Sequence, residues 1–382
     1  MTSTRGCVAT LGRAACVVLL SAAVLCAAAC AGSEANDGDG VRPDGSILAP
    51  NADASDGAAS ADAPEDEDIP RLPCGFGNLC RPPVPFSKES VTAISGRSRG
   101  DVWASGSGGL LMHWNGHEWS LVESRVSNAL THLQLTADEL WAASGTLLLR
   151  RRADSNSVQV IENVSGEEIL WRIVGVAVLP GDNVYLVARH FSTGTGIVTG
   201  LDFGTAALTP VPGPRFSWSD DEQEPQWEAS FLTPGKALWL VGNSAAVARY
   251  PVIDGAAGEG ASSLGQGVMI PVASRVDLRA AWGSGEHLFA VGTHGKILHF
   301  DGAEWTIYDT GTSATLGAIF GLSPTDVWAA GERGTLFHFD GQAWSRIELG
   351  RYVGTLGAIW GSGPEDVWIG GEDRLFHWGP LP

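Results

Sequence analysis

The sequence predicts an all-β protein, a seven-bladed β-propeller of four-stranded antiparallel blades. Three observations support this fold class. A unit of four short apolar runs recurs from about residue 84 to the end of the chain, turn-forming residues separate the runs, and the clearest copies repeat about every 40 residues, which is the period of a propeller blade. Because one four-stranded sheet cannot bury both of its faces alone, neighbouring units must stack.

The clearest unit spans Leu316 to Ile347. Its apolar runs are Leu316 to Phe320, Val327 to Ala330, Leu336 to Phe339 and Trp344 to Ile347. Short runs that are rich in β-branched and aromatic residues and bounded by Gly, Pro and Asp are typical of strands. The pair Asp340-Gly341 indicates a tight turn between two of them. The unit is therefore predicted to be a four-stranded antiparallel meander.

Seven copies align on an aromatic residue in the second strand. These aromatic residues are Trp103, Trp141, Tyr185, Trp239, Phe289, Trp328 and Trp368. The regular spacings between these residues are 38, 39 and 40 residues, and those in the middle of the chain are 44, 54 and 50. The longer spacings predict insertions between the strands of the weaker, central copies.

Two phrases of the repeat resemble known propeller families. HFDGAEW (His299 to Trp305), with its copies HFDGQAW and HWNGHEW, resembles the tail of an Asp-box (BNR) repeat. VWAAGERGTLFH resembles a phrase of propellers related to photosystem II assembly factors. The resemblance covers roughly residues 84 to 378 and implies the propeller fold. It departs from the Asp-box in having His at the serine position and three residues between Asp and Trp.

The N-terminus is typical of a bacterial export signal. Arg5 and Arg13 precede a nearly all-apolar stretch from Ala14 to Ala29, which is short for a membrane span and suits a signal core. The end of this stretch, AAAC, resembles a lipobox with Cys30 as the acylated residue, although Ala27 stands where Leu is usual. Cleavage without lipid is the alternative. Since Ala31 is not the Asp typical of inner-membrane retention, we expect a protein lipid-anchored to the outer membrane or cell envelope, either periplasmic or surface-exposed.

The segment after Cys30 is predicted to be a disordered acidic linker. Residues 33 to 69 hold eleven acids and one base, so more than half of the net charge of −19 lies there, and a segment this poor in apolar residues cannot offset the entropy of ordering. An acidic chain without a basic patch argues against nucleic-acid binding. The predicted organisation is a lipoprotein signal peptide (1–30), the linker (31–73), and a propeller with an N-terminal disulfide clip (74–382).

Cys74 and Cys80 are the cysteines that remain beyond the signal and Cys30. In an exported protein such a pair indicates a disulfide. The last copy of the repeat stops after three strands, and a ring avoids an open edge only if one terminus completes the blade of the other. We predict that Val84 to Ser87 supplies this strand beside Leu375 to Trp378, with Phe86 in the position of Trp344.

Two sets of repeated residues are candidates for ligand binding. A histidine recurs on the third strand, as His113, His299, His338 and His377, but copies in different blades are too far apart to ligate one metal ion. An aromatic residue recurs on the first strand, as Trp282, Phe320 and Trp360. These could stack sugars, although the packing of neighbouring blades needs such residues. We interpret both sets as structural and predict no metal and no cofactor.

The sequence favours a binding protein over an enzyme. Sialidases on related propellers need three arginines and a Tyr/Glu pair. Here Arg172 and Arg279 begin first strands, no third arginine is evident, and only four tyrosines are present. There is no HExxH motif and no P-loop, so we assign no catalytic residue. The expected function is that of an envelope-anchored, monomeric scaffold that binds a protein or glycan; a sialidase-like or lyase-like enzyme and a carbohydrate-binding propeller are the alternatives.

The candidate recognition site is the long connection from Pro214 to Gln226. It carries Trp218 beside four acids, Asp220, Asp221, Glu222 and Glu224. An aromatic residue amid charges suits an interface, and long loops on rigid scaffolds are often functional. The alternative is a solvated insertion without a role. We expect these five residues to meet a basic partner or a divalent cation.

Overall fold

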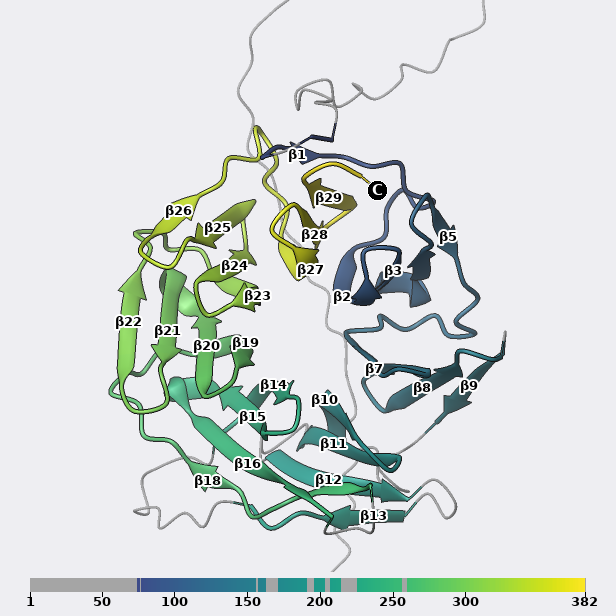
Figure 1. The fold of residues 1–382 in the computed structure, drawn as a ribbon, viewed down its shortest axis with the longest axis vertical. Helices are drawn as coiled ribbons and strands as arrows, with labels where there is room; N and C mark the ends of the chain where they lie inside the picture. The colour runs from purple at the N-terminus through teal and green to yellow at the C-terminus, as the bar shows by residue number, and fades with distance from the viewer. Residues whose placement is uncertain are drawn as a thin grey trace, which may run out of the picture. The chain divides into compact units, whose positions relative to one another are not determined.

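The computed structural model describes residues 74–75, 77–155, 157–162, 171–190, 196–202, 207–213, 225–255 and 260–381. In these residues seven antiparallel sheets stand in a ring (Figure 1). The seven-bladed all-β prediction is confirmed. The predicted signal peptide, Cys30 and the linker lie outside the described residues. Within the described part, no helix is long and apolar enough to span a membrane.

The first four blades follow one another in sequence. Blade 1 consists of β2 (Val91–Ser98), β3 (Asp101–Gly106), β4 (Leu111–Trp114) and β5 (Trp119–Leu121). Blade 2 consists of β6 (His132–Leu135), β7 (Glu139–Ser144), β8 (Leu147–Arg152) and β9 (Val158–Ile161). Blade 3 consists of β10 (Trp171–Leu179), β11 (Asn183–His190), β12 (Gly196–Asp202) and β13 (Ala207–Pro210). Blade 4 consists of β14 (Trp227–Thr233), β15 (Ala237–Gly242), β16 (Val247–Asp254) and β17 (Ser262–Leu264), and β18 (Val268–Met269) also pairs with β16.

The last three blades match the clear copies of the repeat. Blade 5 consists of β19 (Leu278–Ser284), β20 (His287–Gly292), β21 (Lys296–Phe300) and β22 (Trp305–Asp309). Blade 6 consists of β23 (Leu316–Ser323), β24 (Asp326–Gly331), β25 (Thr335–Phe339) and β26 (Trp344–Arg346). Blade 7 consists of β27 (Leu356–Gly363), β28 (Asp366–Gly371) and β29 (Arg374–Trp378), with β1 (Leu79–Cys80) as its outer strand.

The N-terminal segment closes the ring, but with a different strand from the one predicted. β1 pairs with β29, and Leu79 lies opposite Trp378 as Trp344 lies opposite Phe339 in blade 6. The predicted strand from Val84 to Ser87 was wrong. Prolines at 82, 83 and 85 surround Val84, and a proline cannot donate a ladder hydrogen bond. Val84 and Phe86 instead pack on the core between blades 7 and 1.

A disulfide joins Cys74 and Cys80, as predicted. Cys80 is itself in β1, so the covalent loop belongs to the closing strand and does not precede it. Two hydrogen bonds extend the attachment to blade 7: Gly77 donates its N–H to the Glu365 carboxylate, and Gly379 donates to the carbonyl of Asn78. The clip therefore fixes the N-terminal segment on the last blade.

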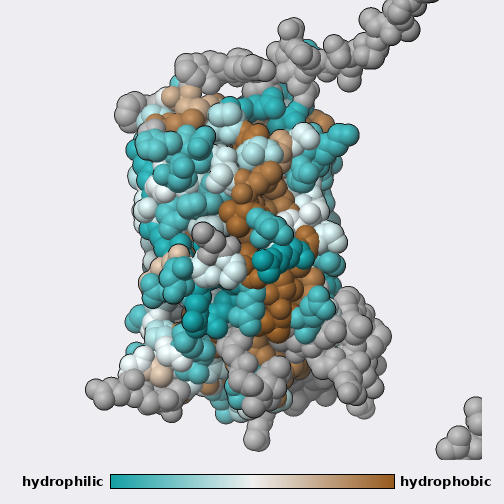
Figure 2. All heavy atoms as spheres, turned by 90° about the vertical axis from the view of Figure 1, so that its right-hand side faces the viewer, coloured by the Kyte–Doolittle hydropathy of each residue, from teal (hydrophilic) through white to brown (hydrophobic). Residues whose placement is uncertain are grey.

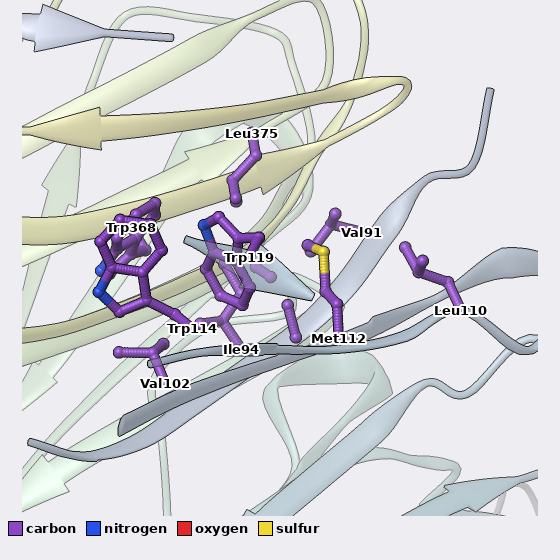
Figure 3. Close-up of a cluster of buried hydrophobic side chains, with 11 residues drawn as sticks. Val91, Ile94, Val102, Leu110, Met112, Trp114, Trp119, Trp368 and Leu375 are labelled. Carbon is purple, nitrogen blue, oxygen red and sulfur yellow. The ribbon is translucent and has the colours of Figure 1, made fainter. Parts of the chain in front are cut away.

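The hydrophobic core lies between blades. Each cluster of buried side chains joins two neighbouring sheets, as in the cluster formed by blades 7 and 1 (Figure 3). There Trp368 lies 5.1 Å, between ring centroids, from both Trp114 and Trp119. The second-strand aromatics are at most 3% exposed in six blades. This burial explains why the aromatic position marks the repeat so clearly.

Apolar side chains at the contact between blades 1 and 2 reach the surface of the ring. Figure 2 shows a band of apolar side chains on the side of the ring that these blades form. Val122, Val126 and Val160 pack at the margin of this cluster, and Leu121 is 60% exposed. The rim of the propeller therefore carries apolar surface here.

Candidate functional site: an arginine cluster where the first strands begin

The two faces of the ring differ in which connections they carry. We call the face at which each first strand begins the entry face; it also carries the connections between second and third strands. We call the opposite face, with the turns between first and second strands, the turn face. This geometry follows from the antiparallel order of the strands in each blade.

Three arginines gather on the entry face of blades 3 to 5. Arg172 is the second residue of β10 and lies opposite Arg189 of β11. Arg279 is the second residue of β19 in blade 5. Glu228 is the second residue of β14 in blade 4. It forms ion pairs with Arg189 of blade 3 and Arg279 of blade 5. We call Arg172, Arg189, Glu228 and Arg279 the arginine cluster.

Glu228 holds two of the three guanidinium groups. Arg189 donates through Nη1 to its Oε1 atom, and Nη1 of Arg279 lies 3.3 Å from the same oxygen. Arg279 also lies 3.9 Å from the carboxylate of Asp277, which accepts a hydrogen bond from the backbone N–H of Ser244. The side chain of Arg279 is 38% exposed, and Arg172 is exposed to solvent.

His132, the first residue of β6, extends the cluster to blade 2. Burial, together with the positive charge of Arg172, lowers the pKa of His132 to about 4. Its Nδ1 atom lies 3.0 Å from the Thr131 hydroxyl. His132 is therefore neutral near pH 7 and adds no charge beside Arg172.

The local backbone explains why the charges of blades 4 and 5 reach the same place. Strand pairing shifts by one residue between Trp227 and Ala229 in β14, and between Leu278 and Ala280 in β19. Glu228 and Arg279 are the extra residues of these two bulges. A bulge leaves one residue outside the ladder and redirects its side chain, so the same repeat position in adjacent blades carries an acid and a base side by side.

The cluster suits a ligand that carries carboxylates or phosphates. Two guanidinium groups contact Glu228, and Arg172 lies opposite one of them, Arg189, on the neighbouring strand. Three arginines against Glu228 and Asp277 leave a positive charge on an otherwise acidic protein. Arginine presents a planar fork of donors that fits a carboxylate in bidentate fashion. A partial counter-ion such as Glu228 holds the guanidinium groups in place before a ligand arrives.

Arg189 and Glu228 were not among the residues selected from the sequence. The sequence does contain an indication of Glu228. This residue follows the first apolar residue of its strand, as Arg279 does, so aligned copies show opposite charges in neighbouring blades. The indication of Arg189 is weaker. In most copies the second strand ends in Gly, whereas in blade 3 it continues through Arg189 to His190. That extension places Arg189 beside Arg172.

The five residues predicted to form the recognition site lie outside the described residues. They are Trp218, Asp220, Asp221, Glu222 and Glu224. The described chain resumes at residue 225 and enters β14 two residues later. The segment that carries these five residues therefore leads into the strand of Glu228.

The recurring histidines belong to structural units within single blades. His113, His338 and His377 each pair with the aspartate that begins the second strand, at 2.9, 2.8 and 2.8 Å. Each imidazole also lies over the second-strand tryptophan, with ring centroids 4.3 Å apart. The described residues contain no group of three or more potential metal ligands.

Other blades replace the histidine by related groups. In blade 5 His299 pairs with His287 at 3.0 Å and stacks on Phe289. In blade 2 Arg150 lies over Trp141 and pairs with Glu139. A polar side chain packed on the second-strand aromatic therefore recurs in several blades of this ring, and this structural role accounts for the repeated histidine.

The first-strand aromatics form part of the core between blades. Trp282 is 6% exposed and lies 6.2 Å, between ring centroids, from Phe320 of the next blade. Phe320 in turn lies 6.4 Å from Trp360. These residues therefore pack between blades, as interpreted from the sequence.

Features that would support an enzyme lie apart from the arginine cluster. The four tyrosines have partners elsewhere: Tyr185 accepts a hydrogen bond from Leu264, and Tyr352 donates one to the carbonyl of Glu372. Tyr250 is buried in blade 4, and Tyr308 packs on Phe339. The letters of a GxSxG motif do occur, from Gly96 to Gly100, but they form the hairpin between β2 and β3, whereas a nucleophile elbow needs a strand followed by a helix.

Comparison with known proteins identifies fold neighbours. No protein-family model and no curated protein matches the sequence. A structure of YCF48 from Cyanidioschyzon merolae matches with a TM-score of 0.61 and 13% identity, over 79% of this chain and 98% of that one. The chain folds like YCF48.

Two further structures extend the comparison. YCF48 bound to D1 peptide matches with a TM-score of 0.57 and 15% identity, over 81% of this chain and 99% of that one. The WD40 β-propeller domain of Doa1 matches with a TM-score of 0.53 and 12% identity, over 79% of this chain and 95% of that one. At these identities the likeness to YCF48 and to Doa1 shows the fold alone.

Proposed function

We propose that this protein is a protein-binding propeller whose entry face holds an acidic, extended segment of a partner. The arginine cluster carries the proposal. Arg172, Arg189 and Arg279 come from two separate blades on either side of Glu228, so they present donors over a surface wider than one carboxylate needs. A peptide with several acidic groups can contact more than one of these arginines at once.

The fold comparison supports peptide binding by a ring of this kind. A structure of YCF48, which has the same fold, contains a bound D1 peptide. Rigid propellers suit such binding because loops and strand ends at one face converge near the axis while the blades keep them in place.

The protein acts, in our proposal, while tethered to the cell envelope. The lipobox-like sequence before Cys30 supports acylation at that residue, and the acidic segment from 31 to 73 suits a tether between membrane and propeller. A multiply acylated cysteine anchors a protein stably, whereas one acyl chain does not. A monomeric scaffold on the outer membrane would present its entry face to other envelope proteins.

The test compares binding of an acidic peptide to wild-type protein and to the double variant R172Q/R279Q. A fluorescent decapeptide with alternating Glu and Ala serves as probe. Each charge-assisted contact contributes roughly 1.5–3 kcal/mol, so we expect the double variant to bind at least about tenfold more weakly. The matched control is R81Q/R346Q, which removes the same charge from exposed positions away from the cluster.

The two variants together test whether the arginine cluster binds the acidic peptide. Loss of affinity in R172Q/R279Q with wild-type affinity in R81Q/R346Q supports the proposal. Equal losses would show that only net charge matters, and an unaffected R172Q/R279Q would exclude the cluster as the binding site.

A sialidase-like or carbohydrate-binding function is the second candidate, because the structure supplies the third arginine that the sequence did not reveal. Arg189 lies opposite Arg172 and shares Glu228 with Arg279. A fluorogenic sialoside tests turnover, and titration with a sialylated sugar tests binding alone. Turnover that disappears in R279Q would favour the enzyme over the protein-binding scaffold.

A further inference from the structure

The turn face carries a separate cavity on blades 2, 3 and 4. It has a volume of about 760 Å³ and is lined by the turns between the first and second strands of these blades, together with the turn after β8. This volume lies in the range of ligand sites, about 300–1,000 Å³. The arginine cluster lies at the other end of the first strands, so the two sites do not overlap.

The cavity occurs where the inner aromatic residues are missing. Opposite the second-strand aromatic, the first strands of blades 4 to 7 carry Phe231, Trp282, Phe320 and Trp360. The rings follow one another around the axis at 6.5, 6.2 and 6.4 Å between centroids. At the same position blades 1, 2 and 3 carry Ser95, Gln134 and Ala177. Small or polar residues leave the space that large rings fill elsewhere.

The residue after this position is glycine in blades 5, 6, 7 and 1, each of which follows a blade that carries an inner aromatic ring. Gly96 and Gly321 lie against the rings of Trp360 and Trp282, and a Cβ atom on either glycine would lie within 2.5 Å of the ring. In blades 2, 3 and 4 this residue is Leu135, Val178 or Leu232, each of which lines the cavity. In blades 2 to 4, aliphatic side chains therefore border an open space at the position where the other blades have a glycine.

The cavity is acidic as well as apolar. Four carboxylates line it, those of Asp138, Glu139, Asp154 and Asp182, against one guanidinium, that of Arg152. Arg152 is already 3.2 Å from Glu139, which also binds Arg150. Within the described part of the chain, the three aspartates make no ion pair. An aliphatic wall with unpaired acids at its rim complements a cation on an apolar stem.

We propose that this cavity binds a lysine side chain presented by an extended segment of a partner protein. The methylene groups lie along Leu135, Val178 and Leu232, and the ammonium group reaches the aspartates at the rim. The site goes beyond the proposed function, because it has the opposite charge preference and lies on the opposite face. Two such sites let one propeller hold an acidic and a basic segment at the same time.

The test is calorimetric titration of the full-length protein with two peptides, acetyl-Ala-Leu-Lys-Leu-Ala-amide and the same peptide with Glu in place of Lys. We expect binding of the lysine peptide only. The variant D138N/D154N/D182N should weaken it about tenfold or more, since three exposed charge contacts are lost. Asn is well suited to position 182, where φ is +59°. The control E118Q/E123Q/E304Q changes the net charge equally at exposed acids outside the cavity.

A steric variant tests the cavity independently of charge. Ala137 is exposed and lines the cavity, so A137W should fill its mouth and reduce the affinity by a similar factor, whereas A303W, at an exposed turn of blade 5, should not. The proposal is overturned if the lysine peptide does not bind, if both triple variants lose affinity equally, or if A137W binds like wild type. Binding of the acidic decapeptide at the entry face should be unchanged in all of these variants, which separates this result from the test of the arginine cluster.

Discussion

The aspartate–histidine pairs offer a controlled measurement of what burial does to one interaction. Asp366–His377 in blade 7 and Asp326–His338 in blade 6 occupy the same repeat position with the same 2.8 Å separation. Their environments differ: the side chains are 5% and 0% exposed in blade 7, but 23% and 29% exposed in blade 6. We expect D366A to destabilise the protein much more than D326A.

The magnitude follows from what each histidine loses. In D326A, water can reach the imidazole of His338, and exposed pairs contribute about 0–1 kcal/mol. In D366A, the fully buried imidazole of His377 loses its carboxylate partner. An unsatisfied buried polar group costs about 1–3 kcal/mol, or more if charged. We therefore predict a loss of about 3 kcal/mol for D366A and about 1 kcal/mol or less for D326A.

Urea unfolding of the two full-length variants, followed by tryptophan fluorescence, measures both losses on the same scale. The ring centroids of the second-strand tryptophan and the histidine lie 4.3 Å apart in each blade, so each pair has a tryptophan beside it. Equal losses in the free energy of unfolding for D366A and D326A would refute the prediction that burial decides how much each pair contributes.

Three further predictions concern the N-terminus and pH. Cys30→Ser should abolish lipid labelling and move the protein into soluble fractions; a wild-type protein that is already soluble would exclude the anchor. Reduction of the Cys74–Cys80 disulfide should increase the mass by two hydrogens and lower the stability by about 2 kcal/mol, so C74S/C80S should unfold at lower urea. The folded pKa of His132 is about 4, below its unfolded value of about 6.5, so the folded state binds fewer protons between these values. Stability should therefore fall by about 3 kcal/mol as pH drops through this window. His132→Gln should flatten that part of the profile, and an unchanged profile would contradict the assignment.

Much of the fold could be predicted because its signals are local. A turn such as Asp340-Gly341 and a buried aromatic such as Trp328 define their blade within some 30 residues, and the same arrangement recurs along the chain. The structural role of His338 could likewise be inferred, since copies on different blades cannot share one ligand.

The candidate sites were harder to predict, because they form between blades. Arg189 and Glu228 are 39 residues apart, and nothing in either local sequence indicates the other. The cavity arises because Ser95, Gln134 and Ala177 stand where the other blades carry a large aromatic ring. The lack of a ring is visible only once the aligned strands of all seven blades are compared.

By itself the sequence determined the number of blades, their four-stranded antiparallel plan and the pairing of the two cysteines, because repeat period, turn residues and a short cysteine spacing are properties of the chain alone. Only the tertiary structure decided which strand closes the ring and which charges meet. Leu79 closes the ring because its neighbours can donate hydrogen bonds where those of Val84, three prolines, cannot. Arg279 meets Glu228 because stacking of adjacent blades brings the same repeat position of each into contact.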